Sequence, residues 1–293
     1  MYEAFYKLKA KPFQLSPDPS FFYSSKGHSR AMDYLLYGLH QGEGFIVITG
    51  EIGAGKTMLV RKLARQLQSQ NVLMAHVVNT RLGADELVRM VLSAFELEHQ
   101  DSKTANLNAL ERFLAGLHKQ RRRALLVVDE AQNLPLASVE ELRMLSNFMR
   151  DDKPLLQIFM LGQPELRHLL QDPSLEQLRQ RIIATCHLGA LNAEETEAYV
   201  LHRLQTAGWA GDPSFEAAAF GEIHAYTEGV PRRVNLLCDR LMLVGMMDEK
   251  HAFGIEEVRQ VIEDVSREFA APVGSRASGR GTPRRSRRKD DGG

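Results

Sequence analysis

The first two thirds of the chain alternate short, continuous apolar runs with longer amphipathic stretches. The apolar runs predict strands at 45–50, 72–78, 124–129 and 155–161, and a last strand that ends near Leu188. Apolar residues at helical spacing predict helices over 57–67, 84–95, 107–120 and 136–149. Strands that are apolar throughout are buried on both faces. The pattern therefore predicts an α/β fold, a five-stranded parallel sheet with helices on both sides and right-handed crossovers.

From Asn192 onward the pattern contains helices only, over about 193–208, 214–229, 231–247 and 254–269. Asn192, Gly208 and Pro231 are residue types that start or stop helices, and they stand where these stretches begin or end. We expect an α/β core with an N-terminal arm over 1–191, a small helical domain over 192–269 and a tail over 270–293.

Charge is unevenly placed along the 293 residues, although the formal net charge is zero. Residues 271–293 hold seven basic and two acidic side chains, so this tail carries +5 and the remainder −5. A basic tail rich in Gly, Ser and Pro is predicted to be disordered. Two interpretations stay open, a solubilising end or an electrostatic tether to anionic lipid or nucleic acid.

Cysteine usage and hydropathy narrow the class of protein. Cys186 and Cys238 lie far apart and form no CxxC pattern, which argues against a disulfide scaffold or a zinc site and fits a reducing compartment. No apolar run approaches the roughly 20 residues of a membrane span, and the N-terminus has no apolar signal region. We therefore expect a cytoplasmic protein, at most peripheral at the inner membrane.

The segment GEIGAGKT, Gly50–Thr57, fits the phosphate-binding pattern G-x-x-x-x-G-K-[ST] between a predicted strand and a predicted helix. Small residues let backbone N–H groups and the helix N-terminus surround phosphates. Lys56 is expected to reach the β- and γ-phosphates of ATP, and the Thr57 hydroxyl to bind Mg²⁺. The alternative is a glycine turn with a chance GKT. The predicted nucleotide-binding residues are Gly50, Glu51, Ile52, Gly53, Ala54, Gly55, Lys56, Thr57 and Met58.

A second candidate motif is LLVVDE, Leu125–Glu130, an apolar strand that delivers two carboxylates at its C-terminal end. Asp129 is predicted to bind Mg²⁺ directly or through water, and Glu130 to polarise the attacking water. Alone, such a pair could be a helix cap with its neighbour. Beside a phosphate loop it indicates a nucleotide hydrolase rather than a pure binder.

The strand predicted at 72–78 comes between the phosphate-loop strand and the Asp129 strand in sequence. This is the arrangement of the additional-strand branch of P-loop ATPases. In that branch the strand after the acidic pair ends in a polar residue that senses the γ-phosphate, and here LLQIFMLGQPEL offers Gln163. The alternative for Gln163 is a turn residue before Pro164.

Several stretches together resemble the ExeA/GspA-type AAA+ ATPases, and most specifically the secretion ATPases encoded with exosortase (XrtA, PEP-CTERM) and exopolysaccharide loci. They include PDPSFFY, YGLHQGEGFIVITGEIGAGKT, LLVVDEAQNL, LGQPEL, LRQRI and EGVPRRVNLLCDR. The resemblance runs from Met1 to about Phe269. The ExeA type carries a membrane span and a peptidoglycan-binding region after the ATPase, and neither follows here, so we expect the shorter, soluble exosortase-associated group.

The resemblance also implies roles for residues outside the two phosphate motifs. Arg232 matches the second sensor, a helical-domain arginine that reaches back to the γ-phosphate, and Arg233 is the weaker candidate. Arg181, or Arg179, matches an arginine finger given to the neighbouring subunit's ATP. The alternative for each is a surface arginine paired with a carboxylate. The N-terminal PDPSFFY stretch, with Phe22, Tyr23 and His28, matches one that runs near the base. Packing of these aromatic residues between the arm and the core is the interpretation we favour.

These observations predict an ATP- and Mg²⁺-dependent AAA+ ATPase that forms a homo-oligomeric ring or filament. We expect it to couple hydrolysis to assembly or export in exopolysaccharide- or exosortase-linked secretion, with membrane-associated secretion or polysaccharide-export proteins as partners. An alternative is a DNA-binding ATPase of the transposition-helper (MuB/TniB-like) type, with which the basic tail is compatible. A third is a nucleotide-gated scaffold with negligible turnover, against which Glu130 counts.

Overall fold

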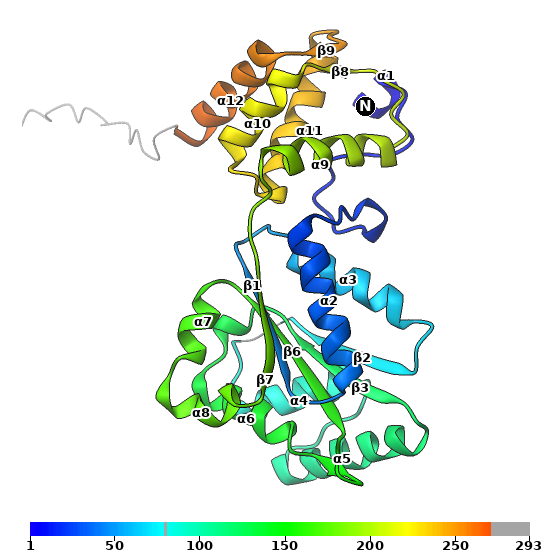
Figure 1. The fold of residues 1–293 in the computed structure, drawn as a ribbon, viewed down its shortest axis with the longest axis vertical. Coiled ribbons are helices and arrows are strands. Elements are labelled where there is room, and N and C mark those ends of the chain that lie inside the picture. Colours follow the sequence, from blue (N-terminus) through cyan, green and yellow to red (C-terminus); the bar gives the residue numbers. More distant parts are fainter. Residues whose placement is uncertain (79–80, 271–293) are drawn as a thin grey trace, which may run out of the picture.

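The computed structural model describes residues 1–78 and 81–270, and the predicted disordered tail lies outside them apart from its first residue. Two units are stacked along the long axis of the molecule, an α/β unit and a smaller helical unit (Figure 1). The N-terminal segment lies against the helical unit, and the chain then descends into the α/β unit. The helical unit therefore contains the N-terminal segment as well as the helices that follow the sheet.

The α/β unit is built on a five-stranded parallel sheet with the strand order β2-β3-β6-β1-β7. Its strands are β1 (Phe45–Gly50), β2 (Val72–Val77), β3 (Arg123–Val128), β6 (Leu156–Gly162) and β7 (Ile182–Leu188). Strand β6 separates β1 from β3, so the predicted five-stranded parallel sheet with an additional strand is confirmed. Because all five strands are parallel, the C-terminal ends of β1 and β3 lie at the same end of the sheet.

Helices cover both faces of the sheet, because every second residue of a strand points to the same side. Ile46 and Ile48 of β1 pack with one apolar cluster, and Phe45 and Val47 pack with another on the opposite face. The first face is covered by α2 (Lys26–Gln41) and α3 (Lys56–Leu67). The second is covered by α4 (Ala84–Ala94), α5 (Lys103–Lys119), α6 (Leu136–Leu145), α7 (Glu165–Leu170) and α8 (Glu176–Arg179).

Two helix boundaries differ from the sequence prediction by four residues. Helix α6 ends at Leu145 rather than 149, because Met149–Arg150 (β4) and Lys153–Pro154 (β5) pair as a tight antiparallel hairpin. Helix α5 begins at Lys103 rather than 107, because the Ser102 hydroxyl accepts a hydrogen bond from the Ala105 amide and caps the helix there. Both differences arise from local polar and turn residues that apolar spacing does not register.

The helical unit has its own apolar core. It contains α9 (Ala193–Thr206), α10 (Ala217–Thr227), α11 (Pro231–Met247) and α12 (Ile255–Ala270), with a short bridge between β8 (Ser214–Phe215) and β9 (Ala252–Phe253). Helix α1 (Tyr2–Phe5) packs against it, and the Tyr2 hydroxyl donates to Asp239 Oδ1 at 2.5 Å. The start of the N-terminal arm, which we had grouped with the α/β core, is thus part of the helical unit's core.

The two units also meet where the chain leaves the sheet. The Leu191 amide donates to the Gly229 carbonyl at 2.9 Å, and Gly229 has φ +67. A Cβ on Gly229 would stand 1.9 Å from the Leu191 carbonyl oxygen, so only glycine fits this crossing. None of the helices in the described part of the chain is long and apolar enough to cross a membrane.

Candidate nucleotide-binding site

The segment after β1 forms a tight loop that ends where α3 begins at Lys56. Gly55 precedes the helix with φ +97, and a Cβ there would meet the ring of His28 at 2.6 Å. The Lys56 ammonium is buried and donates to the carbonyls of Gly50 at 2.6 Å and Glu51 at 3.0 Å. The loop is therefore closed around its own lysine, with the N-terminus of a 12-residue helix directed at the same space.

Burial lowers the pKa of the Lys56 ammonium, and the nearby carboxylates of Glu130 and Asp129 oppose that shift without cancelling it. A desolvated ammonium gains more from a bound anion than an exposed one does, since the effective dielectric is lower. The electrostatics thus favour a polyphosphate next to Lys56.

Two oxygen donors meet beside the phosphate loop. The Thr57 hydroxyl donates to Asp129 Oδ2 at 3.2 Å, so one small cation can contact both. Hydroxyl and carboxylate oxygens suit Mg²⁺, which takes one or two carboxylates and completes its shell with phosphate and water. Within the described residues there is no cluster of three or more His, Cys, Asp or Glu side chains arranged for a metal ion. These residues fit Mg²⁺.

His76, on β2, is a neighbour of this pair that the sequence analysis did not single out. Its Nε2 lies 3.8 Å from Asp129 Oδ2, is buried and makes no hydrogen bond to any residue that the structure describes. Burial by itself raises the pKa of Asp129, but the His76 ring and the hydrogen bonds from the Glu130 amide and Thr57 outweigh it, so the pKa lies below its usual value. Asp129 is thereby kept ionised, as a cation ligand must be.

Glu130 occupies a left-handed backbone conformation, with φ +52, directly after β3. Its carboxylate accepts a hydrogen bond from Gln132 Nε2 at 2.6 Å and another from Gln163 Nε2 at 3.0 Å. The backbone N–H of Gln163 donates to Gln132 Oε1 at 3.0 Å. A Cβ at Gly162 would stand 2.7 Å from that Gln132 oxygen, so the glycine makes room for the network. The candidate sensor Gln163 therefore contacts the candidate catalytic carboxylate.

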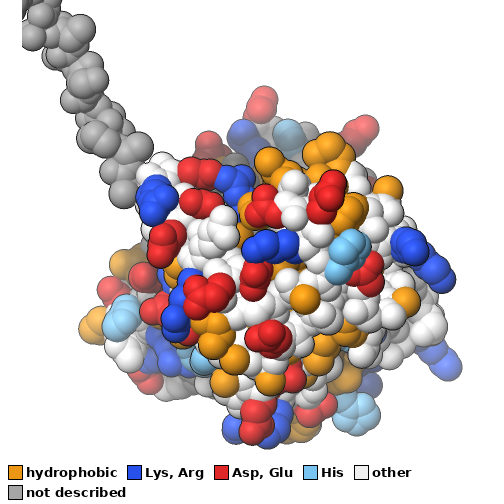
Figure 2. All heavy atoms as spheres, turned by 90° about the horizontal axis from the view of Figure 1, so that it is seen from above, with side chains coloured by type: hydrophobic (Ala, Val, Ile, Leu, Met, Phe, Trp, Pro, Cys, Tyr) orange, Lys and Arg blue, Asp and Glu red, His pale blue; other side chains and the backbone are white. Residues whose placement is uncertain are grey.

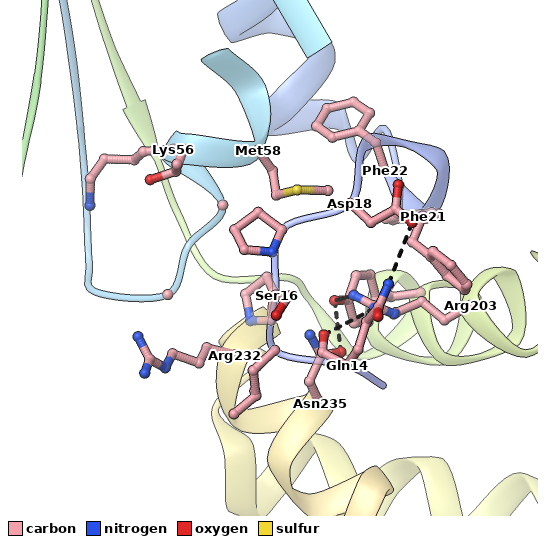
Figure 3. Close-up of a pocket in the computed structure, with 18 of the residues that line it drawn as sticks. Gln14, Ser16, Asp18, Phe21, Phe22, Lys56, Met58, Arg203, Arg232 and Asn235 are labelled. Atoms are coloured by element: carbon pink, nitrogen blue, oxygen red, sulfur yellow. Dashed lines mark hydrogen bonds between the residues drawn. The ribbon is translucent and has the colours of Figure 1, made fainter. Parts of the chain in front are cut away.

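A cavity of about 340 Å³ lies between the α/β unit, the N-terminal arm and the helical unit. Gly53, Gly55, Lys56, Thr57, Met58 and Glu130 line it from the core, and Gln14–Asp18 and the three aromatic residues at 21–23 line it from the arm. Tyr199, Arg203, Arg232 and Asn235 line it from the helical unit. Figure 3 shows, around this space, Lys56 and Met58 from α3, Arg232 from α11, and Gln14, Ser16, Asp18, Phe21 and Phe22 from the arm.

The arm's aromatic side chains have two kinds of neighbour. Phe22 packs edge-on against His28 at 5.6 Å between ring centroids, and Tyr23 packs against Tyr199 at 5.9 Å. Phe21 is buried. All three also line the cavity, so the packing that we favoured for them coexists with a position at its wall. They make that end of the cavity apolar and aromatic, in contrast to the phosphate-loop end.

His28 joins the arm to the phosphate loop. Its Nε2 lies 3.0 Å from the Ala54 carbonyl oxygen, and its Nδ1 lies 2.7 Å from the Ser25 hydroxyl. Because a carbonyl only accepts, Nε2 carries the proton and Nδ1 accepts from Ser25, which a neutral ring satisfies. Burial lowers the pKa of His28, and the Ala54 carbonyl and Glu195 oppose the shift.

Acidification is therefore expected to destabilise the wild type more than a His28→Gln variant. The unfolded chain binds a proton on His28 near the ordinary pKa of 6.5, whereas the folded ring resists it. The stability supplied by the neutral ring is present above that pH and is lost as the pH falls through the folded-state pKa. Thermal midpoints at about pH 7.5 and about pH 5 measure this. His187 and His202, whose pKa values are also lowered, are common to both proteins. Equal losses in the two proteins would contradict the role assigned to His28.

Arg232 and Arg233 differ in position. The Arg232 amide donates to the Gly53 carbonyl at 3.3 Å, and its side chain lines the cavity (Figure 3). Arg233 points elsewhere and forms an exposed ion pair with Glu228. The arrangement agrees with the preference for Arg232 as the second sensor, a role that stays a prediction.

Arg181 directly precedes β7, at the N-terminal end of the parallel strands, whereas the phosphate loop follows the C-terminal end of β1. The Phe45 amide at the start of β1 donates to the Arg181 carbonyl, and the exposed Arg181 side chain donates to the Ser146 hydroxyl at 3.1 Å. Arg179 instead donates to the carbonyls of Leu170 and Asp172 within its own loop. Arg181 is thus remote from its own nucleotide site and displayed at the surface, as a residue that acts on a neighbouring subunit must be.

A parallel sheet in this order, with a phosphate loop after β1, an acidic pair after β3 and a helical unit against the site, is the fold of the AAA+ P-loop NTPases. Residues 39–170 match the family model described as an AAA domain. Among solved structures, the chain is similar to the Aeropyrum pernix ORC2 protein (TM-score 0.65, 15% identity, 87% of this chain and 72% of that chain). It is also similar to Cdc6p from Pyrobaculum aerophilum (TM-score 0.66, 15% identity, 89% and 74%). At these identities the likeness concerns the fold.

A more specific similarity is found in the amino-acid sequence. The chain is 39% identical over 256 residues to the General secretion pathway protein A of Aeromonas hydrophila, across 86% of this chain and 46% of that protein. It therefore spans about half the length of that relative. The chain is thus similar to an AAA domain over residues 39–170 and to that secretion-pathway protein over most of its own length.

Proposed function

We propose that this protein binds ATP with Mg²⁺ at the cavity between its two units and hydrolyses it as a homo-oligomer. One observation carries the proposal: the phosphate loop, the Thr57–Asp129 oxygen pair and the Glu130 carboxylate converge at one end of a cavity that a helical unit closes. A glycine turn alone, or a helix cap alone, requires no such convergence.

Each residue then has a defined task. Lys56 and the N-terminus of α3 neutralise phosphate charge, and Thr57 and Asp129 hold the cation. When bound, Mg²⁺ would supply positive charge that neutralises the phosphates. Glu130 orients the attacking water and accepts its proton, and Gln163 and Gln132 hold the Glu130 carboxylate at the position the structure gives it. Arg232 ties the γ-phosphate to the helical unit, so that phosphate release changes the position of that unit.

We further propose that the ATPase energises assembly or export at the cytoplasmic face of the inner membrane. The named secretion-pathway relative supports a role in secretion. The link to exopolysaccharide and exosortase systems rests on the sequence resemblance, and partner proteins on that membrane follow from it. The DNA-binding alternative gains no support from the exposed face of the helical unit, where acidic and basic side chains are interspersed rather than gathered into a basic surface (Figure 2).

A shared active site predicts that the ATPase rate per subunit rises with protein concentration and falls strongly in Arg181→Ala, which should still bind ATP. The nucleotide cavity of the Arg181→Ala subunit should stay intact, because Arg181 lies at the opposite end of the strands from the phosphate loop. Arg122→Ala, an exposed arginine on the same molecule, is the matched control.

Mixing the two variant proteins tests directly whether the active site is shared between subunits. A Glu130→Gln subunit retains Arg181, so adding it to Arg181→Ala should restore part of the rate by completing the intact sites of the latter. A rate that is independent of concentration, with Arg181→Ala as active as wild type, would remove the oligomeric site and leave a monomeric ATPase.

A further inference from the structure

Arg203, in the middle of the helical unit, is a buried cation that faces the N-terminal arm. Its guanidinium donates from Nε to the Pro12 carbonyl, from Nη2 to the Gln14 carbonyl at 3.3 Å and from Nη1 to the Tyr199 hydroxyl at 2.9 Å. It also lies 5.1 Å from the centre of the Phe21 ring. One side chain of α9 thus makes polar and ring contacts with three arm residues.

The same stretch of the arm is attached to the α/β unit further along. The Arg61 guanidinium of α3 donates to the Pro17 carbonyl at 2.5 Å, and Arg65 lies 4.0 Å from Asp18. Between the two attachments, Gln14 to Asp18 line the cavity. The side-chain Nε2 of Gln14 donates to Asp18 Oδ2 at 3.4 Å (Figure 3). The arm therefore bridges the two units along one wall of the cavity.

The contacts of Arg203 continue into the cavity wall of the helical unit. The Tyr199 hydroxyl that accepts from Arg203 donates to Asn235 Oδ1 at 2.9 Å, and all three side chains line the cavity. Lys56 and Thr57 belong to the opposite, phosphate-loop side and are not among the partners of Arg203. Arg203 is thus tied to the arm and to the aromatic end of the cavity.

We propose that Arg203 is a positioning residue for the base of the nucleotide. It acts through Pro12 and Gln14, whose carbonyls it fixes, and through the Phe21 ring on which it packs, so that the arm forms the wall against which the base lies. This inference rests on the proposed function, because it assigns one end of the same cavity. Lysine cannot replace the arginine in this role, since a single ammonium lacks the planar fork that serves three acceptors at once.

The test separates the base from the phosphates. Binding of ATP and of inorganic tripolyphosphate, each with Mg²⁺, is measured by calorimetry for wild type, Arg203→Met and Arg203→Lys. Arg203→Met is expected to weaken ATP binding by about tenfold or more, because it removes charge-assisted hydrogen bonds that shape the base wall. Tripolyphosphate binding should change by less than about twofold, since the phosphate loop is untouched. Arg203→Lys should behave in the same direction.

A matched control is Arg259→Met, which removes an exposed arginine of the same unit that pairs with Glu222 at 2.7 Å and should change neither affinity. Equal weakening of both ligands in the Arg203 variants, or unchanged ATP binding, overturns the inference. If Arg203→Met fails to fold by circular dichroism, Arg203→Lys, which keeps the charge, decides by the same ratio of affinities. Wild type that binds neither ligand would overturn the proposed nucleotide site itself, an outcome distinct from the others.

Discussion

Lys56→Ala is expected to abolish ATP binding, with at least about a hundredfold loss of affinity, since charge-assisted hydrogen bonds to phosphate are among the strongest in proteins. The ammonium is buried within the phosphate loop, and its hydrogen bonds to two loop carbonyls hold it at the point where we expect the phosphates to bind. Calorimetric titration with ATP and Mg²⁺ measures the loss.

The control for this variant is Lys62→Ala, which removes a lysine further along α3 and away from the cavity. It should bind ATP as the wild type does. ATP affinity that is equal in Lys56→Ala and wild type would mean that the loop does not hold the phosphates, and the nucleotide site would have to lie elsewhere.

Glu130→Gln is expected to separate binding from turnover. The substitution keeps the size of the side chain but removes the charge that accepts a proton, so the rate should fall by about 10² to 10⁴ while ATP affinity is retained. Phosphate release under single-turnover conditions, together with calorimetric binding, measures both quantities. The carboxylate is held by Gln132 and Gln163, and both contacts must readjust to a neutral amide.

Glu111→Gln is the matched control, because Glu111 is an exposed carboxylate on α5 that does not line the cavity. It should leave turnover unchanged. Unaltered turnover in Glu130→Gln would favour a nucleotide-gated scaffold, in which binding rather than hydrolysis carries the signal.

The sheet could be predicted because its strands are buried on both faces. A run such as FIVITG has no polar side to obscure it, and the glycine-rich loop that follows has a spacing fixed by phosphate geometry. The predicted strand at 124–129 and the observed β3, Arg123–Val128, differ by one residue at each end. Local composition is sufficient where the constraint is local.

The rest of the site depends on contacts that no local pattern encodes. Arg203 and Pro12 are 191 residues apart, and nothing in the helical spacing of α9 marks Arg203 as different from a surface arginine. Gln132 carried a weak signal, since it follows the acidic pair by two residues, and His76 carried another, as the one polar residue in an apolar run. Each could have been listed as a candidate from sequence, but its partner could not.

The bond between Tyr2 and Asp239 spans 237 positions of the chain and has a consequence for folding during synthesis. Tyr2 is synthesised long before α11 and can reach its partner only after α11 has been made, whereas the strands of the sheet can pair earlier. Tyr2, Tyr6 and Phe13 are apolar or aromatic and remain uncovered throughout that interval. The nascent α/β unit therefore carries an apolar segment without its native partners, and we expect chaperones to bind the chain at this stage, before the helical unit is complete.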